Sequence, residues 1–405
     1  MNKSLLTFVL LGCTTAALAG SVDKLTEQDG KLNISGYIQA QAQWGEPKAK
    51  LRVGEANSGN DAYNRWGIRR GHLKIEYKLG LTKSVFQLDM TEKKLGIKDA
   101  YFQIGSPWKK MNKSSLKFGL FNRPFGHEIA YSSSQRESPE RSFIFPALFP
   151  HERDLGAMLT LQASDQLFLS MFKLEAGLFA GNGINPERDS RRDFIGHLTA
   201  SDRIGDLLDW SIGASYYHGC VLQTTEHVYR MQGHGFVHYE SEAYRGAFAI
   251  RRYWGLDGRF ALSTPLGKTQ LRAEYLWGDQ PSTQKSHKSP DTSKVEQANM
   301  FIRPIAGGYA MLVQELGTLP LSLVAKYDWF DPNTSVADEQ IGNGETTSAD
   351  ISQRTVGVGL LWHINNSLLM QAYADFNFNE VSSAVKGYEA DRRDDVLTLR
   401  LQYKF

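Results

Sequence analysis

Hydrophobic and polar residues alternate strictly over the last residues of the chain, Asp394–Phe405. One parity carries only apolar side chains, namely Leu397, Leu399, Leu401, Tyr403 and Phe405. The other parity carries polar and charged side chains, namely Thr398, Arg400, Gln402 and Lys404. Successive side chains of a β-strand point to opposite faces, so this segment predicts a strand with one apolar and one charged surface. The apolar face would form the core of a soluble sandwich, or would meet lipid in an outer-membrane barrel whose charged face lines a lumen.

The same alternation recurs along the chain and predicts sixteen strands. In the first of them, for example, Leu32 and Ile34 share a parity, and Asn33 and Ser35 share the other. The predicted strands are 31–44, 68–79, 83–90, 97–104, 116–123, 155–162, 167–179, 193–200, 208–217, 253–263, 269–277, 300–313, 321–329, 353–362, 368–378 and 394–405. A helix would have placed both sets of residues on all of its faces, so the expected fold class is all-β.

The connections between these strands alternate in length. Short turns are expected at 80–82, 164–166, 265–268, 317–320 and 363–367. Long polar connections lie at 45–65, 124–153, 181–192, 218–252, 278–298, 331–352 and 379–393. Short turns on one side and long loops on the other are typical of outer-membrane barrels. We therefore expect a transmembrane antiparallel β-barrel of 16 strands with both termini on the short-turn side.

The connection 218–252 leaves the strand count open. Its part 237–248 has the composition for an additional hairpin, which would give 18 strands. The apolar positions from Trp254 to Leu262 continue a single outward row across Gly255 and Gly258, which favours one long loop. Trp44, Trp277, Trp329, Trp362 and Phe405 fall near predicted strand ends, as expected of the aromatic girdles at the two membrane interfaces.

The first residues have the three regions of a secretory signal peptide. Lys3 precedes an apolar run, and Ala17-Leu18-Ala19 provides a small-residue cleavage site. We expect residues 1–19 to be the signal peptide and 20–405 to form a single barrel domain in the outer membrane of a Gram-negative bacterium. A rival interpretation takes Leu10-Leu11-Gly12-Cys13 as a lipoprotein box with an acylated cysteine. After cleavage Cys220 is the one cysteine left, so no intrachain disulfide is expected.

Charge and motifs exclude several classes of function. The chain has 46 Lys and Arg against 44 Asp and Glu, a balance that predicts no nucleic-acid partner. No apolar run of about 18 residues follows the signal, which excludes helical membrane spans. The sequence contains no zinc-protease, nucleophile-elbow, phosphate-loop or calcium-loop motif, and its 10 His are scattered. We therefore expect no enzyme activity, no cofactor and no metal.

The segment after the fourth predicted strand resembles a known family. Lys117–Gly126 (KFGLFNRPFG), Glu140-Arg141-Ser142 and Arg153-Asp154-Leu155-Gly156 are similar to runs in the phosphate-selective porins O and P. Ile68–Leu73 is similar to the first hairpin of that family, and the aromatic C-terminus fits its ending. The resemblance is specific over about ninety residues, from Ile68 to Leu161. It implies a sixteen-stranded homotrimeric barrel in which an infolded loop narrows the pore and Arg and Lys select anions.

The connection 124–153 has the composition of such a constriction loop. It contains several prolines and the aromatic residues Phe125, Phe143, Phe145 and Phe149, and it is too apolar to stay in solvent. The barrel interior is the place where it can pack. Its basic and acidic residues are nearly balanced, so the loop alone does not form an anion site.

Fixed positive charges in a narrow passage can replace part of the hydration of an anion. Arg suits phosphate because its planar fork donates two parallel hydrogen bonds, and Lys acts as a point charge. The candidate pore residues are Arg123, Arg141, Arg153, Lys117, Arg70, Lys74, Arg272 and Arg400. Any of them could instead form a salt bridge that only braces the wall.

The expected partners are small hydrophilic solutes or anions, phosphate among them, and outer-membrane lipid. The terminal strand ending in Phe405 is expected to be recognised by the barrel assembly machinery. Two alternatives stay open. One is a general or sugar-passing porin, with Tyr37, Tyr101 and Phe121 as an aromatic slide. The other is a plugged barrel whose long loops, such as 218–252, bind a partner.

Overall fold

The computed structural model describes residues 30–57, 61–92, 95–150, 152–185, 187, 189–290 and 298–405. The expected signal peptide and the rival lipoprotein box lie outside these residues. The strands are β1 (Lys31–Gly45), β2 (Tyr63–Leu79), β3 (Thr82–Met90), β4 (Leu95–Gly105), β5 (Ser115–Asn122), β6 (Arg153–Gln162), β7 (Phe172–Phe179), β8 (Asp193–Ile204), β9 (Leu208–Leu222), β10 (His227–Gln232), β11 (Gly235–Glu240), β12 (Phe248–Thr264), β13 (Gly267–Ser282), β14 (Met300–Glu315), β15 (Leu321–Asp331), β16 (Gln353–His363), β17 (Leu368–Asn379) and β18 (Val396–Lys404). The helical turns are η1 (Lys109–Met111), α2 (Ile144–Leu148), η2 (Phe168–Met171), η3 (Glu242–Tyr244), η4 (Asp338–Gln340) and η5 (Ser348–Asp350).

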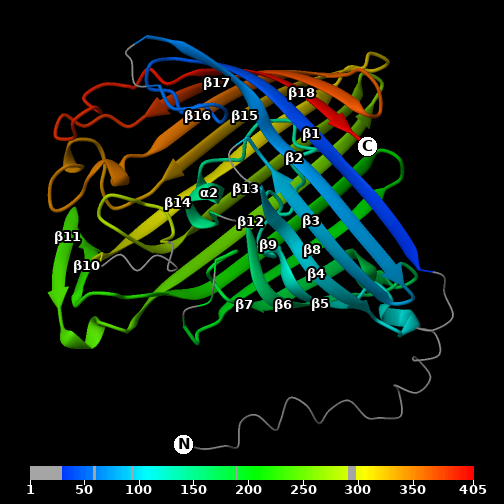
Figure 1. Ribbon diagram of the computed structural model, residues 1–405, viewed down its shortest axis with the longest axis horizontal. Helices are drawn as coiled ribbons and strands as arrows, with labels where there is room; N and C mark the ends of the chain where they lie inside the picture. Colours follow the sequence, from blue (N-terminus) through cyan, green and yellow to red (C-terminus); the bar gives the residue numbers. More distant parts are fainter. Residues whose placement is uncertain are drawn as a thin grey trace, which may run out of the picture.

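Sixteen of these strands form a closed antiparallel barrel, as predicted (Figure 1). Each pairs with its neighbour in the chain, except that β9 pairs directly with β12. The ring closes where β1 pairs with β18, from Tyr37 opposite Lys404 to Gly45 opposite Val396. Phe405 extends this closure, because it exchanges two backbone hydrogen bonds of 3.0 Å with Gly36. Among the described residues, no helix is long and apolar enough to cross a membrane.

The prediction of one uninterrupted loop at 218–252 was wrong. Strand β9 continues to Leu222, β12 begins already at Phe248, and β10 and β11 form a hairpin between them. The hairpin does not enter the ring. Its strand β10 pairs in parallel with the start of β14, with Val228 opposite Met300. The ring therefore keeps sixteen strands while the sheet has eighteen, because the hairpin extends the wall beyond the end of β15.

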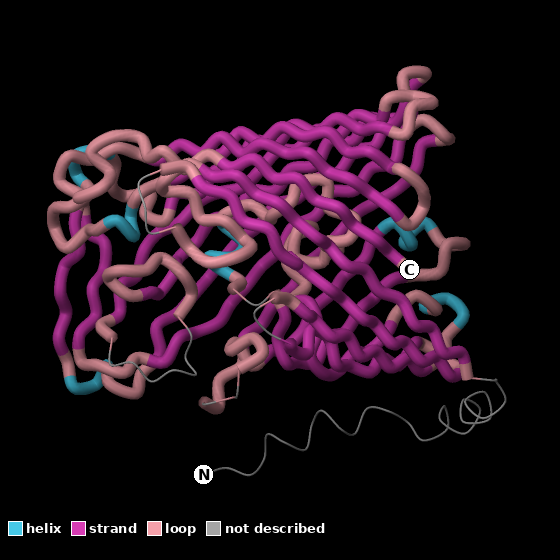
Figure 2. Tube along the Cα trace, turned by 45° about the horizontal axis from the view of Figure 1, so that its top comes forward, coloured by secondary structure: helices cyan, strands magenta, loops and turns pink. Residues whose placement is uncertain are grey.

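The short turns and the C-terminus lie at one end of the barrel, and the hairpin and the long connections lie at the other (Figures 1 and 2). The predicted alternation holds across the wall. On β18, Leu397 and Leu401 are exposed on the outer face, whereas Thr398 and Arg400 are buried inside. The outer face therefore offers apolar side chains to a lipid bilayer.

Two β-bulges interrupt the alternation on the inner face. The register between β1 and β2 shifts between Gln39 and Ala40, and this shift leaves Arg69 as an extra residue. The register between β3 and β4 shifts between Gln87 and Leu88, and here Lys98 is extra. A bulge places two successive side chains on one face. Arg69 and Lys98, which strict alternation assigns to lipid, therefore join their neighbours Arg70 and Asp99 in the interior.

The connection between β5 and β6 folds into the barrel, as expected for a constriction loop. We call residues 123–152 the infolded loop. It contains the short helix α2 and packs an apolar side against the wall, where Phe149 meets Tyr217 and Tyr253 edge to face at 5.9 and 5.8 Å. Phe125 and Phe145 belong to the same buried cluster. This cluster fills one side of the lumen and leaves the charged side of the loop to face the opposite wall.

Candidate pore constriction

Wall side chains hold the infolded loop through its backbone. Gln39, Gln402 and Gln371 donate to the carbonyls of Ser133 (2.9 Å), Ser134 (3.0 Å) and Arg136 (2.9 Å), respectively. The loop is therefore attached on the wall formed by β1, β17 and β18. These bonds are buried or partly buried and join residues far apart in sequence, so they fix the position of the loop in the lumen.

A second attachment lies on another part of the wall. Glu274 on β13 accepts hydrogen bonds from the backbone N–H groups of His127 (3.0 Å) and Glu128 (2.6 Å). Gly126 precedes them with φ of +60°, and a Cβ there would come within 2.1 Å of a Glu274 oxygen. Glycine is the residue that accepts both the left-handed backbone and this close approach. Gly126 and the Glu274 carboxylate thus fix the place where the chain enters the lumen.

Three arginines converge on Glu140 in the loop. Arg69 donates two hydrogen bonds of 2.8 Å to its carboxylate, Arg70 donates one of 2.8 Å, and Arg400 one of 3.2 Å. Burial would raise the pKa of Glu140, but Arg69, Arg70 and Arg400 outweigh this effect and hold the pKa well below its ordinary value. Glu140 therefore stays ionised, and the three arginines leave an excess of positive charge around it.

Arg141 is the next residue and is fixed by the loop itself. Its guanidinium donates to the carbonyls of Glu128 (3.0 Å), Ile129 (3.2 Å) and Tyr131 (3.3 Å), and it forms an ion pair with Glu152. Burial and then the positive charge of Arg136 lower its pKa. The loop carbonyls and Glu152 thus hold the guanidinium in one position.

Arg136 has a buried guanidinium whose positive charge is little compensated by nearby carboxylates. Its three nitrogens have no hydrogen-bond partner among the described residues, and its nearest carboxylate oxygen, on Glu128, lies 3.9 Å away. A buried charged donor without a partner is costly unless solvent or a ligand reaches it. It adds to the positive potential on the charged side of the loop.

The infolded loop separates two cavities. The inner cavity, about 300 Å³, lies toward the short-turn end, where Ser35 and Lys404 line it. Its ionisable lining, apart from His72 and the tyrosines, consists of Lys74, Lys98, Lys117, Arg141, Arg153, Lys404 and a single acidic residue, Asp99. The inner cavity is therefore strongly basic.

The outer cavity, about 230 Å³, lies among the long connections. Its basic lining residues are Lys50, Arg52, Arg141, Lys288, Lys326, Arg354 and Arg392, and its acidic ones are Glu140, Asp328, Asp375 and Asp394. Arg141 belongs to both linings and thus lies at the junction of the two cavities. A solute that passes through the barrel would meet Arg141 between two basic chambers.

The eight candidate residues take different positions relative to this path. Arg141 lies at the junction, and Arg153, Lys117 and Lys74 line the inner cavity. Arg153 is paired with Asp99 at 3.1 Å, and Lys74 with Glu76 at 3.1 Å. These four residues can contact a solute in the inner chamber.

The other four candidates lie outside both cavity linings. Arg70 and Arg400 bind Glu140, as described above. Arg123 pairs with Asp154 at 3.0 Å, and Arg272 pairs with Glu137 and lies over the Tyr131 ring at 4.6 Å. Each of these bonds ties the loop or its hinge to the wall, which is the bracing role considered as the alternative.

Sequence reasoning missed Arg69, Lys98 and Arg136. The first two depend on bulges, whose extra residue leaves no mark in the pattern of hydrophobic and polar residues. Arg136 lies in an irregular segment, where periodicity gives no orientation. Lysines and arginines of the long connections, such as Lys50 and Arg52, were likewise outside the predicted strands.

The barrel is similar in structure to several outer-membrane proteins. OprB of Pseudomonas putida aligns with a TM-score of 0.57 at 10% identity, over 96% of this chain and 97% of that one. OmpF of Salmonella typhi aligns with a TM-score of 0.57 at 11% identity, over 93% of this chain and 98% of that one. The outer membrane channel DcaP of Acinetobacter baumannii aligns with a TM-score of 0.54 at 10% identity, over 94% of this chain and 99% of that one. At these identities the likeness establishes the fold.

A scan against protein-family models and a search of curated proteins give no match for this chain. The resemblance to the phosphate-selective porins therefore stays a hypothesis, carried by the motifs quoted above.

Proposed function

We propose that this barrel is an outer-membrane porin through which small hydrophilic solutes diffuse passively, with a preference for anions such as phosphate. The observation that carries the proposal is the position of Arg141 at the junction of two cavities whose linings are mainly basic. A channel needs binding that is favourable enough for entry and weak enough for release. Salt bridges to Glu152 and Asp99 temper the positive charge of Arg141 and Arg153 in this way.

The two basic residue types would act differently on a passing anion. Arg141 is held in one orientation by three carbonyls and the Glu152 carboxylate, so it offers a passing phosphate or carboxylate a positive charge at a fixed position. Lys74, Lys98 and Lys117 provide point charges along the inner cavity. Passage would therefore be a series of weak contacts rather than capture at a single site.

The sugar-passing alternative has one favourable feature, since Tyr37, Tyr101 and Phe121 line the inner cavity. However, the ammonium of Lys117 lies over the rings of Tyr101 and Phe121, at 5.0 and 5.1 Å. Tyr37 is engaged through its hydroxyl with His72 and Ser133. Covered rings offer little face for sugar stacking, which favours the anion-passing function.

The proposal includes the setting in which a porin works. We propose export by a signal peptide at 1–19, assembly through the terminal strand and Phe405, and a non-enzymatic barrel domain from residue 20 onward. OmpT of Vibrio cholerae, whose fold is similar with a TM-score of 0.54, is described in a trimer form. We extend this assembly to the present chain and propose a homotrimer.

Solute flux into liposomes tests the function directly. Purified protein is reconstituted, and swelling is compared in glucose and in sodium gluconate, two solutes of similar size that differ in charge; gramicidin in the membrane lets sodium follow the anion. We expect swelling in both, with a rate in gluconate at least twice the rate in glucose after subtraction of the protein-free controls. Equal rates would contradict the anion preference, and no swelling in either solute would contradict porin function.

A further inference from the structure

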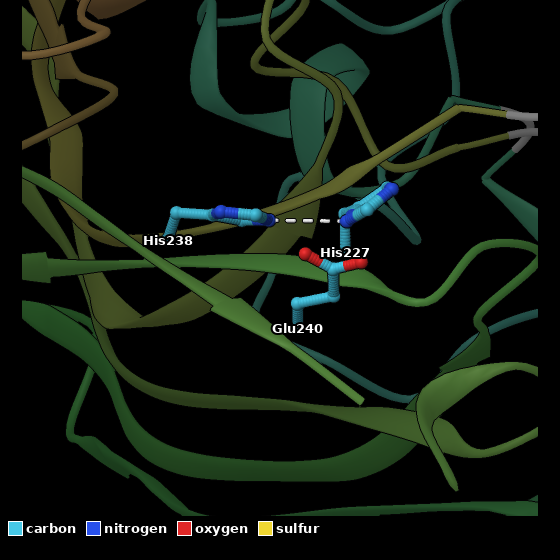
Figure 3. A group of neighbouring side chains, drawn as sticks. All are labelled: His227, His238 and Glu240. Carbon is cyan, nitrogen blue, oxygen red and sulfur yellow. Dashed lines mark hydrogen bonds between the residues drawn. The ribbon is translucent and has the colours of Figure 1, made fainter. Parts of the chain in front are cut away.

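Three side chains that can bind a metal meet on the β10–β11 hairpin, far from the constriction. His227, His238 and Glu240 each offer a ligand atom, and these atoms lie within 4.8 Å of one another (Figure 3). Strand pairing explains the grouping. Glu240 is directly opposite His227, and His238 is opposite Tyr229, two residues along β10. Alternation places all of these side chains on one face of the hairpin.

The two imidazoles already have a spacing close to that of a tetrahedral metal site. Nδ1 of His227 and Nε2 of His238 are 3.1 Å apart. Two nitrogens bound tetrahedrally to Zn²⁺ at about 2.0–2.1 Å lie about 3.4 Å apart. Binding would therefore require the two nitrogens to move apart by only a few tenths of an ångström, with a rotation of the rings toward the ion.

The hairpin is held firmly enough to keep this arrangement. The Tyr229 ring stacks on His238 at 4.7 Å and on Phe301 of β14 at 4.2 Å, nearly parallel to the latter. The backbone N–H of Phe236 donates to the carbonyl of Gly344 in the β15–β16 connection (2.8 Å). Val228 is buried together with residues of β9, β12 and β14. Ligands on a docked hairpin lose little freedom on binding, which favours affinity.

We propose that His227, His238 and Glu240 form a Zn²⁺-binding site on the long-loop side of the barrel. Two imidazoles and one carboxylate are a donor set that suits zinc, and the exposure of His238 and Glu240 leaves a coordination position open to water. The ion would join the two strands of the hairpin near the stack of Tyr229 on Phe301. The site does not depend on the proposed porin function, because none of its residues lines either cavity.

Calorimetric titration of the full-length barrel in detergent with ZnCl₂ tests this site, using protein without a histidine tag. We expect one zinc ion per chain at pH 7.5, with binding at least tenfold weaker in His238→Ala and in His227→Ala. His234→Ala is the matched control, since His234 is exposed in the turn of the same hairpin and its ring bonds to the Ser335 carbonyl, at 3.3 Å. It should bind like the wild type.

Two further measurements separate the site from adventitious binding. Affinity should fall as the pH is lowered from 7.5 to 5.5, because histidine ligates in its neutral form. Cobalt(II) should give the intense visible absorption of a four-coordinate site in the wild type and in His234→Ala, and should lose it in His238→Ala. Unchanged zinc binding in the His227→Ala, His238→Ala double variant, or equal loss in His234→Ala, would overturn the proposal.

Discussion

At the scale of single residues, the constriction is governed by an imbalance between buried arginines and their carboxylates. Glu140 faces three arginines, and Arg136 has no hydrogen-bonded carboxylate among the residues that the structure describes. The excess of positive charge is local, because the whole chain has a formal net charge of only +2. Selectivity in such a barrel depends on where the charges lie, and composition does not report this.

Arg141 should set the sign of the selectivity at the junction of the cavities. Removing one charge about 4 Å from a passing ion changes the ion energy by about 1 kcal/mol even at the dielectric constant of bulk water, or roughly fivefold in relative permeability. We expect Arg141→Gln to lower the chloride-to-potassium permeability ratio by about this factor in planar bilayers. Arg141→Lys keeps the charge and should retain most of the ratio. Equal effects of both substitutions would assign Arg141 a purely structural role.

Acidity should increase the anion preference through the outer cavity. Burial raises the pKa of Asp394 to about 6, and Asp391 and Asp395 add to the rise while Arg392 opposes it. Asp394 therefore loses its negative charge between pH 7.5 and pH 5. Burial lowers the pKa of His287 in the same cavity to about 4, so it stays neutral over this range.

The expected result is a higher chloride-to-potassium permeability ratio at pH 5 than at pH 7.5, by less than about twofold. Asp394→Asn should raise the ratio at pH 7.5 and reduce its pH dependence. A ratio that falls on acidification of the wild type would contradict this assignment.

At the scale of elements, the alternating pattern was enough to predict the sixteen strands of the ring and the direction of their side chains. It was not enough at the two bulges, because one extra residue reverses the parity without changing composition. The β10–β11 hairpin was missed for another reason. Its turn at Gly233 is visible in the sequence, but its pairing with β14 is a contact between distant segments.

For the infolded loop, too, the sequence predicted one property and not another. Its apolar composition predicted burial in the lumen, and the cluster around Phe125, Phe145 and Phe149 has this position. Its bonding partners on the wall, such as Gln371 and Glu274, could not be predicted. They depend on which strand lies opposite at a given height, which requires the register of the whole barrel.

Excision of the infolded loop should widen the pore. Replacing residues 126–150 by a short Gly-Ser linker removes the segment that separates the two cavities. We expect a severalfold rise in single-channel conductance and a loss of anion preference, because Arg136, Glu140 and Arg141 leave together. Unchanged conductance would show that the loop does not limit the current.

Excision of the β10–β11 hairpin is the matched control for excision of the infolded loop. Replacing residues 227–240 by a linker of the same composition should leave conductance within about 20% of the wild type, because the hairpin lines neither cavity. A closed or much altered channel would contradict a hairpin that lies apart from the conducting path.

At the scale of the whole molecule, the barrel combines an apolar outer wall, a lumen divided by one loop and closure by its terminal residue. Phe405 bonds to Gly36, and the Phe405 ring lies so close that a Cβ on Gly36 would approach it within 2.6 Å. The C-terminal aromatic therefore has a structural role in closing the ring, in addition to its proposed recognition during assembly. Both termini of the ring lie at the short-turn end, so the long connections and the hairpin form the opposite face.

The zero-current potential of the purified protein in a planar bilayer, under a tenfold KCl gradient, tests the central claim most directly. We predict a potential of the sign that marks chloride as the more permeant ion, and a decrease in chloride current when phosphate is added. Arg141→Gln should move the potential toward zero. A wild-type potential of zero, or of the sign that marks potassium as the more permeant ion, would contradict an anion-preferring porin. The absence of channels would contradict a porin altogether.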